Sequence, residues 1–298
     1  MTSWRNHDDG KAGASSRTSG PRCGPPPARL ERGRHNVVPL RDRKTPCAGC
    51  TLRARCLPGG LDGKAIPQFD ALVGNQCRLR RGDVLFRAGS PFLALYAIRV
   101  GSLKTSIRAE DGREQVAGCH MIGEIIGLDG IATGSHTCNA VALEDSEACA
   151  VAFDRLEELM HAVPRLQRNV RQTLAREVSR NHGLMLLLGS MRAEERVAAY
   201  LVDLAERHRQ RGCSASEFVL RMTREEIGSY LGLKLETVSR VFSRLQAEGL
   251  VQAQGRDIKL LDPPRLHRLL RGDAPPAAAS DHGHPAAPIP IDSRIASV

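Results

Sequence analysis

The segment 222-MTREEIGSYLGLKLETVSRVFSRLQAEGLV-251 predicts two helices joined by a tight turn. Thr223 and Glu226 have the spacing of a capping box, in which each side chain satisfies a free backbone N–H at a helix start. Gly232 suits the turn between two helices. We expect the second helix to run from Leu235 to Gln246. This order of elements is typical of a helix-turn-helix.

The second helix has the two faces that a DNA-reading helix needs. Val238, Phe242 and Leu245 share the side that would pack on the domain. An arginine can pair with guanine, and a glutamate can accept from cytosine. The candidate DNA-contacting residues are Thr223, Glu236, Ser239, Arg240, Ser243 and Lys259.

The stretch 249-GLVQAQGRDIKLLD-262 follows this helix and predicts a two-stranded wing. Gly255 lies near the expected tip, and Lys259 is placed to reach phosphate. Any amphipathic helix pair with a glycine turn shares part of this pattern. The cap, the turn, the polar face and the wing in this order favour DNA binding.

The sequence upstream divides into contrasting segments. Residues 78–153 contain short β-branched and alternating runs separated by glycine turns, which predict a β-roll or barrel. Pro164 is suited to a helix start. We therefore expect an α+β chain: a jelly-roll-like β-roll, a long dimerisation helix and a C-terminal winged helix-turn-helix. The expected boundaries are a disordered basic tail (1–46), a cysteine loop (47–60), the β-roll (61–155), the dimerisation helix (156–190), the winged helix-turn-helix (191–272) and a disordered tail (273–298).

Apolar residues after Pro164 recur in steps of three and four, from Leu166 to Leu188. Such a narrow stripe, broken once by Asn181, favours a two-stranded coiled-coil dimer. The alternative is a helix packed on its own domain. The residues expected at the dimer interface are Leu174, Val178, Asn181 and Met185.

Composition narrows the class of protein without identifying it. The 298 residues carry a formal charge of +10, but residues 1–56 hold twelve Lys or Arg against four acids, so most of the excess lies in the N-terminal tail. No apolar run is long enough to cross a bilayer, and the polar, Arg-rich N-terminus does not resemble a secretory signal. We therefore expect a cytoplasmic protein without a membrane partner. The chain has no P-loop, GxSxG or HExxH motif, so an enzyme is not expected.

Three cysteines stand close together in 47-CAGCTLRARC-56, among small, polar and basic residues. A reducing compartment disfavours disulfides, so clustered cysteines there indicate metal ligands or a redox centre. Iron–sulfur, structural zinc and unliganded thiols all remain open at this point. The remaining cysteines are expected to be non-ligands: Cys23, Cys77, Cys119, Cys138 and Cys213.

The β-roll, the long helix and 223-TREEIGSYLGLKLETVSRVFSRLQ-246 together resemble the CRP/FNR superfamily of bacterial transcription regulators, from about Cys47 to Gly272. Glu236, Ser239 and Arg240 match the base-reading residues of the FNR branch. The resemblance implies a homodimer on a palindromic DNA site related to TTGAT-N4-ATCAA, with RNA polymerase as a further partner. It also implies control of genes for low-oxygen metabolism.

The resemblance further implies a [4Fe–4S] cluster held by Cys47, Cys50, Cys56 and, from the end of the β-roll, Cys149. The alternative is a regulator of the same superfamily that senses haem or another small ligand, with structural zinc at the cysteines. Binding of cAMP is disfavoured, because the loop after Gly123-Glu124 lacks the Arg-Ser or Arg-Thr pair that members binding cAMP use.

One position departs from the family pattern. Asn181 stands where well-known FNR proteins have aspartate. Two asparagines facing each other can hydrogen-bond, whereas two carboxylates repel. We therefore expect weaker dissociation of the cluster-free dimer in this chain.

Overall fold

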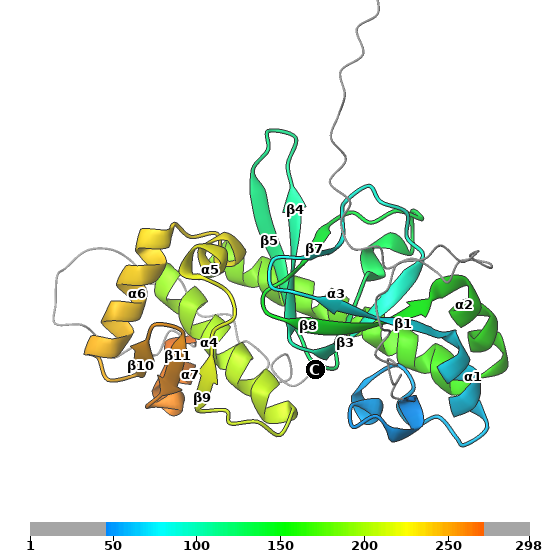
Figure 1. Cartoon of the computed structure of the whole chain (residues 1–298). Coiled ribbons are helices and arrows are strands. Elements are labelled where there is room, and N and C mark those ends of the chain that lie inside the picture. Colours follow the sequence, from blue (N-terminus) through cyan, green and yellow to red (C-terminus); the bar gives the residue numbers. More distant parts are fainter. Residues whose placement is uncertain (1–45, 271–298) are drawn as a thin grey trace, which may run out of the picture.

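The computed structural model describes residues 46–270, which form a β-roll and a C-terminal helical unit linked by one long helix (Figure 1). The two expected tails, 1–46 and 273–298, lie outside the described residues, with the exception of Pro46. Cys23 lies outside them as well. None of the helices in the described part of the chain combines the length and apolar character needed to cross a bilayer.

The cysteine segment folds as two short 3₁₀ turns, η1 (Cys47–Gly49) and η2 (Arg53–Arg55), before helix α1 (Ala65–Leu72). Leu57 and Leu61 are buried in one core with Leu95 of the β-roll and Leu166 of the long helix. Because these side chains share a core, the segment is packed on both neighbours and is not a free loop.

The β-roll consists of two four-stranded antiparallel sheets, in the orders β1-β8-β3-β6 and β2-β7-β4-β5. The alternating sequence runs therefore do form strands, and the expected α+β fold is confirmed. The strands are β1 (Val73–Leu79), β2 (Val84–Phe86), β3 (Ala94–Val100), β4 (Ser102–Arg108), β5 (Glu114–Met121), β6 (Ile125–Ile126), β7 (Asn139–Ala142) and β8 (Ser146–Ala152), with the 3₁₀ turn η3 (Leu128–Gly130) between β6 and β7.

The expected helical region after the β-roll contains two helices, α2 (Phe153–Ala162) and α3 (Pro164–Ser190). The break falls at Pro164, which has no backbone N–H to continue a preceding helix. The apolar stripe of α3 is buried at its start and exposed farther along the helix. Leu166 and Val170 are buried against the β-roll, whereas Val178 is 52% exposed and Met185 is 69% exposed. Only the later part of the stripe is therefore open to a partner.

The C-terminal unit has the expected helix-turn-helix and wing, with one strand more than the sequence indicated. Strand β9 pairs with β11, so the wing belongs to a three-stranded sheet in the order β10-β11-β9. Gly232 ends α5 with a φ of 63°, in the left-handed region that glycine adopts without strain. The elements are α4 (Ala193–Gln210), β9 (Glu217–Val219), α5 (Arg224–Leu231), α6 (Leu235–Ala247), β10 (Val251–Gln254), β11 (Asp257–Leu260) and α7 (Pro263–Leu270).

The hairpin of β4 and β5 rests on α5, so the two units contact each other directly (Figure 1). Lys104 forms an ion pair of 2.8 Å with Glu226. The backbone N–H of Val116 donates to the Ser229 hydroxyl at 2.9 Å. Val116 and Leu143 are also buried in the core of the C-terminal unit. The β-roll therefore contributes apolar as well as polar contacts to the position of the helix-turn-helix.

Candidate DNA-reading surface and cysteine cavity

The start of α5 is fixed by the capping box expected from the sequence. The Thr223 hydroxyl accepts from the Glu226 N–H at 3.1 Å, and the Glu226 carboxylate accepts from the Thr223 N–H at 2.7 Å. Arg224 lies over the Phe242 ring of the next helix, 3.3 Å from its centroid. These contacts hold the two helices in a defined relation.

Helix α6 presents a polar face to solvent and buries its apolar face. Val238, Phe242 and Leu245 are buried, as expected. The opposite side is exposed along the length of the helix, as a groove-reading surface requires. The exposed residues on it are Glu236, Ser239, Arg240 and Ser243.

Three of the candidate DNA contacts also have partners within the chain. Thr223 is engaged in the helix cap. The Ser243 hydroxyl donates to the Ser239 carbonyl at 3.1 Å. Lys259 is paired with Glu217 at 2.7 Å. Arg240 is exposed and reaches only the hydroxyl of Thr237, at 3.4 Å, so most of its guanidinium N–H donors are available to a base.

The four cysteines selected from the sequence line one small cavity. Cys47, Cys50 and Cys56 come from the two 3₁₀ turns, and Cys149 comes from strand β8, about ninety residues later in the chain. Phe69, together with residues of β1, β3 and β8, forms an apolar wall. Within residues 46–270, no three His, Cys, Asp or Glu side chains converge closely enough to hold a single metal ion.

Burial sets the protonation of two of these thiols. Burial, the hydrogen bond with Asp70 and the neighbouring sulfurs raise the pKa of Cys47. Burial, with smaller contributions from Cys149 and Cys50, raises the pKa of Cys56 to about 12. Without a cationic partner these thiols are neutral at pH 7. Holding four thiolates together therefore requires a positively charged group among them.

Comparisons with known proteins agree with this geometry. Residues 76–162 match the model of the cyclic nucleotide-binding domain, and residues 195–269 match that of the Crp-like helix-turn-helix domain. The transcriptional regulatory protein Btr of Bordetella pertussis is 42% identical over 233 residues, covering 78% of this chain and 96% of that protein. The fumarate and nitrate reduction regulatory protein of Escherichia coli is 36% identical over 223 residues, covering 75% and 89%.

The chain belongs to the FNR-type branch of the CRP/FNR family. It is a DNA-binding transcription regulator and not an enzyme. Among solved structures, FixK2 of Bradyrhizobium japonicum is similar, with a TM-score of 0.61 and 32% identity over 69% of this chain and 100% of that one.

A carboxylate of the β-roll is held by the loop that follows it. Asp129 accepts from the backbone N–H of Thr137 at 2.7 Å and of Cys138 at 3.3 Å. His136, stacked on Phe86 with 3.7 Å between ring centroids, reaches the same carboxylate at 3.4 Å. Burial opposes the charge, but the contacts with His136, Thr137 and Cys138 hold the pKa of Asp129 at about 2. These backbone N–H groups are therefore already paired with an anion of the chain itself.

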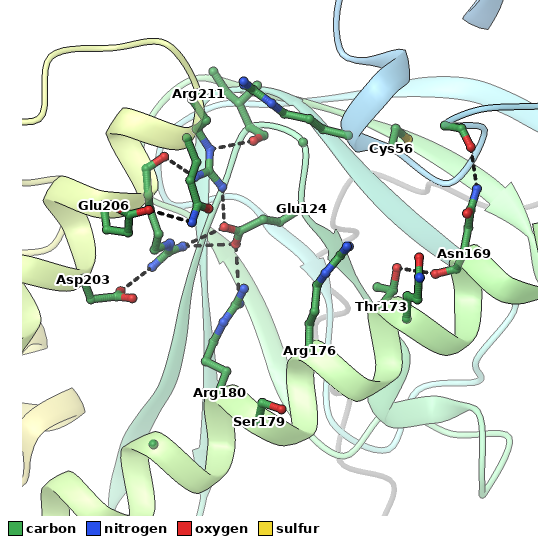
Figure 2. Close-up of a pocket in the computed structure, with 18 of the residues that line it drawn as sticks. Cys56, Glu124, Asn169, Thr173, Arg176, Ser179, Arg180, Asp203, Glu206 and Arg211 are labelled. Carbon is green, nitrogen blue, oxygen red and sulfur yellow. Dashed lines mark hydrogen bonds and ion pairs between the residues drawn. The ribbon is translucent and has the colours of Figure 1, made fainter. Parts of the chain in front are cut away.

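A second contact between the β-roll and the C-terminal unit is a largely buried cluster around Glu124 (Figure 2). Arg207 of α4 lies 3.0 Å from its carboxylate, Arg180 of α3 lies at 3.5 Å, and Arg211 pairs with its other oxygen. Burial would raise the pKa of Glu124, but the three arginines, Arg207 foremost, hold it at about 2. One carboxylate of the β-roll thus binds both following helices.

Sequence reasoning missed two further connecting residues. Asn169 of α3 donates to the carbonyls of Leu57 and Gly59, each at 2.8 Å, and so ties the long helix to the cysteine loop. Arg196 donates to the carbonyls of Leu188 and Leu231 and thereby fixes the junction of α3, α4 and α5. A polar residue on a helix gives no sequence signal for such contacts, because the accepting carbonyls are distant in the chain.

Replacing the central carboxylate should be costly. Glu124→Gln removes the nearer carboxylate of Arg207 and leaves it only the more exposed Asp203, so we expect a loss of about 3 kcal/mol in the free energy of unfolding at pH 7. Because the folded pKa is lowered to about 2, the wild type has this stability in full above about pH 4.5 and loses it as the pH falls toward 2. Urea unfolding at several pH values measures both effects.

Between about pH 4.5 and pH 2, the free energy of unfolding of Glu124→Gln should change less with pH than that of the wild type. Glu110→Gln, at an exposed hairpin position, is the matched control and should behave like the wild type. Equal stability of Glu124→Gln and Glu110→Gln would show that the cluster does not stabilise the fold.

Base reading by Arg240 can be separated from backbone contact. Arg240→Ala should cost about 1–3 kcal/mol per half-site on an operator selected from random sequence, and much less on non-specific DNA. Lys259→Ala, if it contacts phosphate, should weaken both about equally. Fluorescence anisotropy with the two DNAs gives the measurement, and equal losses for Arg240→Ala on both would assign it to the DNA backbone.

Proposed function

We propose that this FNR-type regulator holds a [4Fe–4S] cluster through Cys47, Cys50, Cys56 and Cys149 and controls transcription in response to oxygen. The observation that carries the proposal is that these four thiols, three from one loop and one from β8, line the same cavity. The relatives named as regulators of anaerobic metabolism support the same assignment.

The donor set fits such a group. Four soft sulfur ligands suit iron–sulfur chemistry. The wall around them is apolar, and neutral Cys47 and Cys56 gain a favourable counter-charge when iron binds their thiolates. Arg53 and Arg99 also line the cavity and can offset the negative charge of a cluster with four thiolates.

A cluster held by Cys47, Cys50, Cys56 and Cys149 would supply an oxygen-labile centre to which the cysteine loop is anchored. The chain then has a direct route from this loop to the long helix. Leu57, next to Cys56, is buried against Leu166 of α3, and its carbonyl accepts from Asn169. We infer that an ordered loop holds the first half of α3 in place and that a released loop loosens it.

The exposed second half of α3 is the proposed dimer interface. Val178, Asn181 and Met185 lie on one side of the helix and are open in the single chain, while Leu174 is partly buried against the core below. Pairing of two such stripes would bury the apolar side chains and place two α6 helices on successive major grooves.

The proposed DNA site is a palindrome related to TTGAT-N4-ATCAA, read by Glu236, Ser239 and Arg240. We propose the cytoplasm as the working compartment, since it holds the DNA, and RNA polymerase as the further partner. The genes controlled are proposed to serve low-oxygen metabolism.

The ligand assignment is tested by serine substitution. Cys149→Ser should lose the cluster when the protein is reconstituted without oxygen, because serine lacks the soft thiolate that iron prefers. Cys47→Ser, Cys50→Ser and Cys56→Ser should give the same result. Iron, sulfide and zinc analysis with a visible absorption spectrum measures the content and separates the cluster from zinc or haem.

Cys213→Ser, at an exposed position outside the cavity, is the control and should keep full iron and sulfide. If Cys149→Ser keeps the cluster while Cys119→Ser or Cys138→Ser loses it, the fourth ligand is assigned wrongly. If the wild type contains zinc and no sulfide, the four cysteines hold a structural zinc ion and the iron–sulfur proposal is wrong.

The dimer interface is tested at Asn181. Asn181→Asp should weaken the cluster-free dimer, because two partly desolvated carboxylates would repel by about 1 kcal/mol or more. The cluster-bound dimer should be less affected. Val178→Asp, in the same exposed stripe, should break both, as measured by sedimentation. If the cluster-free wild type is wholly monomeric and Asn181→Asp does not change its sedimentation, Asn181 does not lie at the dimer interface.

A further inference from the structure

A second, larger cavity of about 720 Å³ lies between the cysteine loop, α3 and α4 (Figure 2). Its size falls within the range of small-molecule sites. Residues 129–138, the β-roll loop that contains Asp129 and His136, are not among the described residues that line it. The cavity is much larger than the cysteine cavity and adjoins it, since Cys56 and Gly123 line both.

The lining is strongly cationic. It contains six arginines and three carboxylates: Arg55, Arg165, Arg176, Arg180, Arg207, Arg211, Glu124, Asp203 and Glu206. Each carboxylate already has an arginine partner, as in the pairs of Asp203 with Arg207 and of Glu206 with Arg209. The charge of the lining is thus not neutralised by its own acids.

Three of the arginines have no ion pair with any residue in the range 46–270: Arg55, Arg165 and Arg176. Figure 2 shows Arg176 extending from α3 into the cavity without a marked contact. Asn169, Gln172 and Ser179 add neutral polar groups from the same helix. Guanidinium groups in such a setting match the oxygens of phosphates and carboxylates.

We propose that this cavity binds a small molecule with at least two negative charges, either a phosphorylated metabolite or a polycarboxylate. Arg55 of the cysteine loop and Arg176 of α3 provide guanidinium groups that no residue within 46–270 pairs with. Because they come from different elements, one anion held by both joins the cysteine loop to the long helix. The site is thus a second input to the regulator, coupled to the first through the cysteine loop.

The proposed dimer does not cover this cavity. The α3 residues that line it are at positions 165, 169, 172, 173, 176, 179, 180, 183, 184 and 187. At about 100° per residue, this set and the proposed interface residues Leu174, Val178, Asn181 and Met185 are centred about 160° apart around the helix. The two faces are therefore nearly opposite, and a partner helix on one leaves the other open.

Calorimetric titration of the full-length protein with pyrophosphate and with citrate at low ionic strength tests the proposal. We expect one saturable site per chain for at least one probe, with affinity reduced at least tenfold in Arg176→Gln and in Arg55→Gln. Binding of pyrophosphate alone would indicate a phosphorylated ligand, and binding of citrate alone a polycarboxylate.

Two matched controls locate the anion. Arg168→Gln changes an exposed arginine of α3 outside the cavity lining, and Arg240→Gln changes the DNA-reading face; neither should alter the affinity. Titration of Cys149→Ser separates this proposal from the iron–sulfur one. If losing the cluster releases the loop that carries Arg55, the affinity falls toward that of Arg55→Gln, whereas if the iron–sulfur proposal fails, the affinity equals that of the wild type and still falls in Arg176→Gln. Absence of saturable binding by both probes, or loss in Arg240→Gln but not in Arg176→Gln, would overturn the proposal.

Discussion

The arrangement of this protein depends on one largely buried carboxylate. Glu124 lies between β5 and β6 of the β-roll and binds Arg180 of the long helix, Arg207 of α4 and Arg211, which follows α4 directly. A carboxylate in this surrounding is stable only while its cations remain, and the cations are equally dependent on it. The β-roll, the long helix and the DNA-binding unit are therefore held together by the same ion pairs. A shift of any one of them would leave some of these charged groups without a partner.

A second connection starts at the cysteine loop. Its backbone carbonyls are held by Asn169, and its leucines share a core with Leu166. Any event at the thiols therefore acts on the first turns of α3 by a short path of packed groups. At the other end of that helix, Arg196 donates to the carbonyls of Leu188 in α3 and Leu231 in α5, and so links the end of α3 to the helix-turn-helix. These contacts give a physical basis for coupling between the sensor and DNA.

Helix α3 has three roles on three sides. One side, with Leu166 and Val170, completes the core of the β-roll. A second carries Arg176 into the cationic cavity. A third leaves Val178 and Met185 exposed to solvent. In the proposed mechanism one helix responds to the cysteine loop, to an anion and to a second chain, because a rotation or shift of its axis changes all three sides together.

Local patterns in the sequence predicted the elements that depend on neighbouring residues. The Thr223–Glu226 cap, the turn at Gly232 and the inward face of α6 follow from spacing alone, since each involves residues within a few positions. The grouping of Cys149 with Cys47, Cys50 and Cys56 came from family resemblance, as nothing in the spacing joins a strand residue to a loop so far away. Only the tertiary structure revealed that Leu166 and Val178, although in one stripe, face a core and solvent respectively. It also placed Glu124 among three arginines and Asp129 against the backbone N–H groups of Thr137 and Cys138. Burial and charge pairing between distant segments decide these features, and a linear pattern does not record which segments meet.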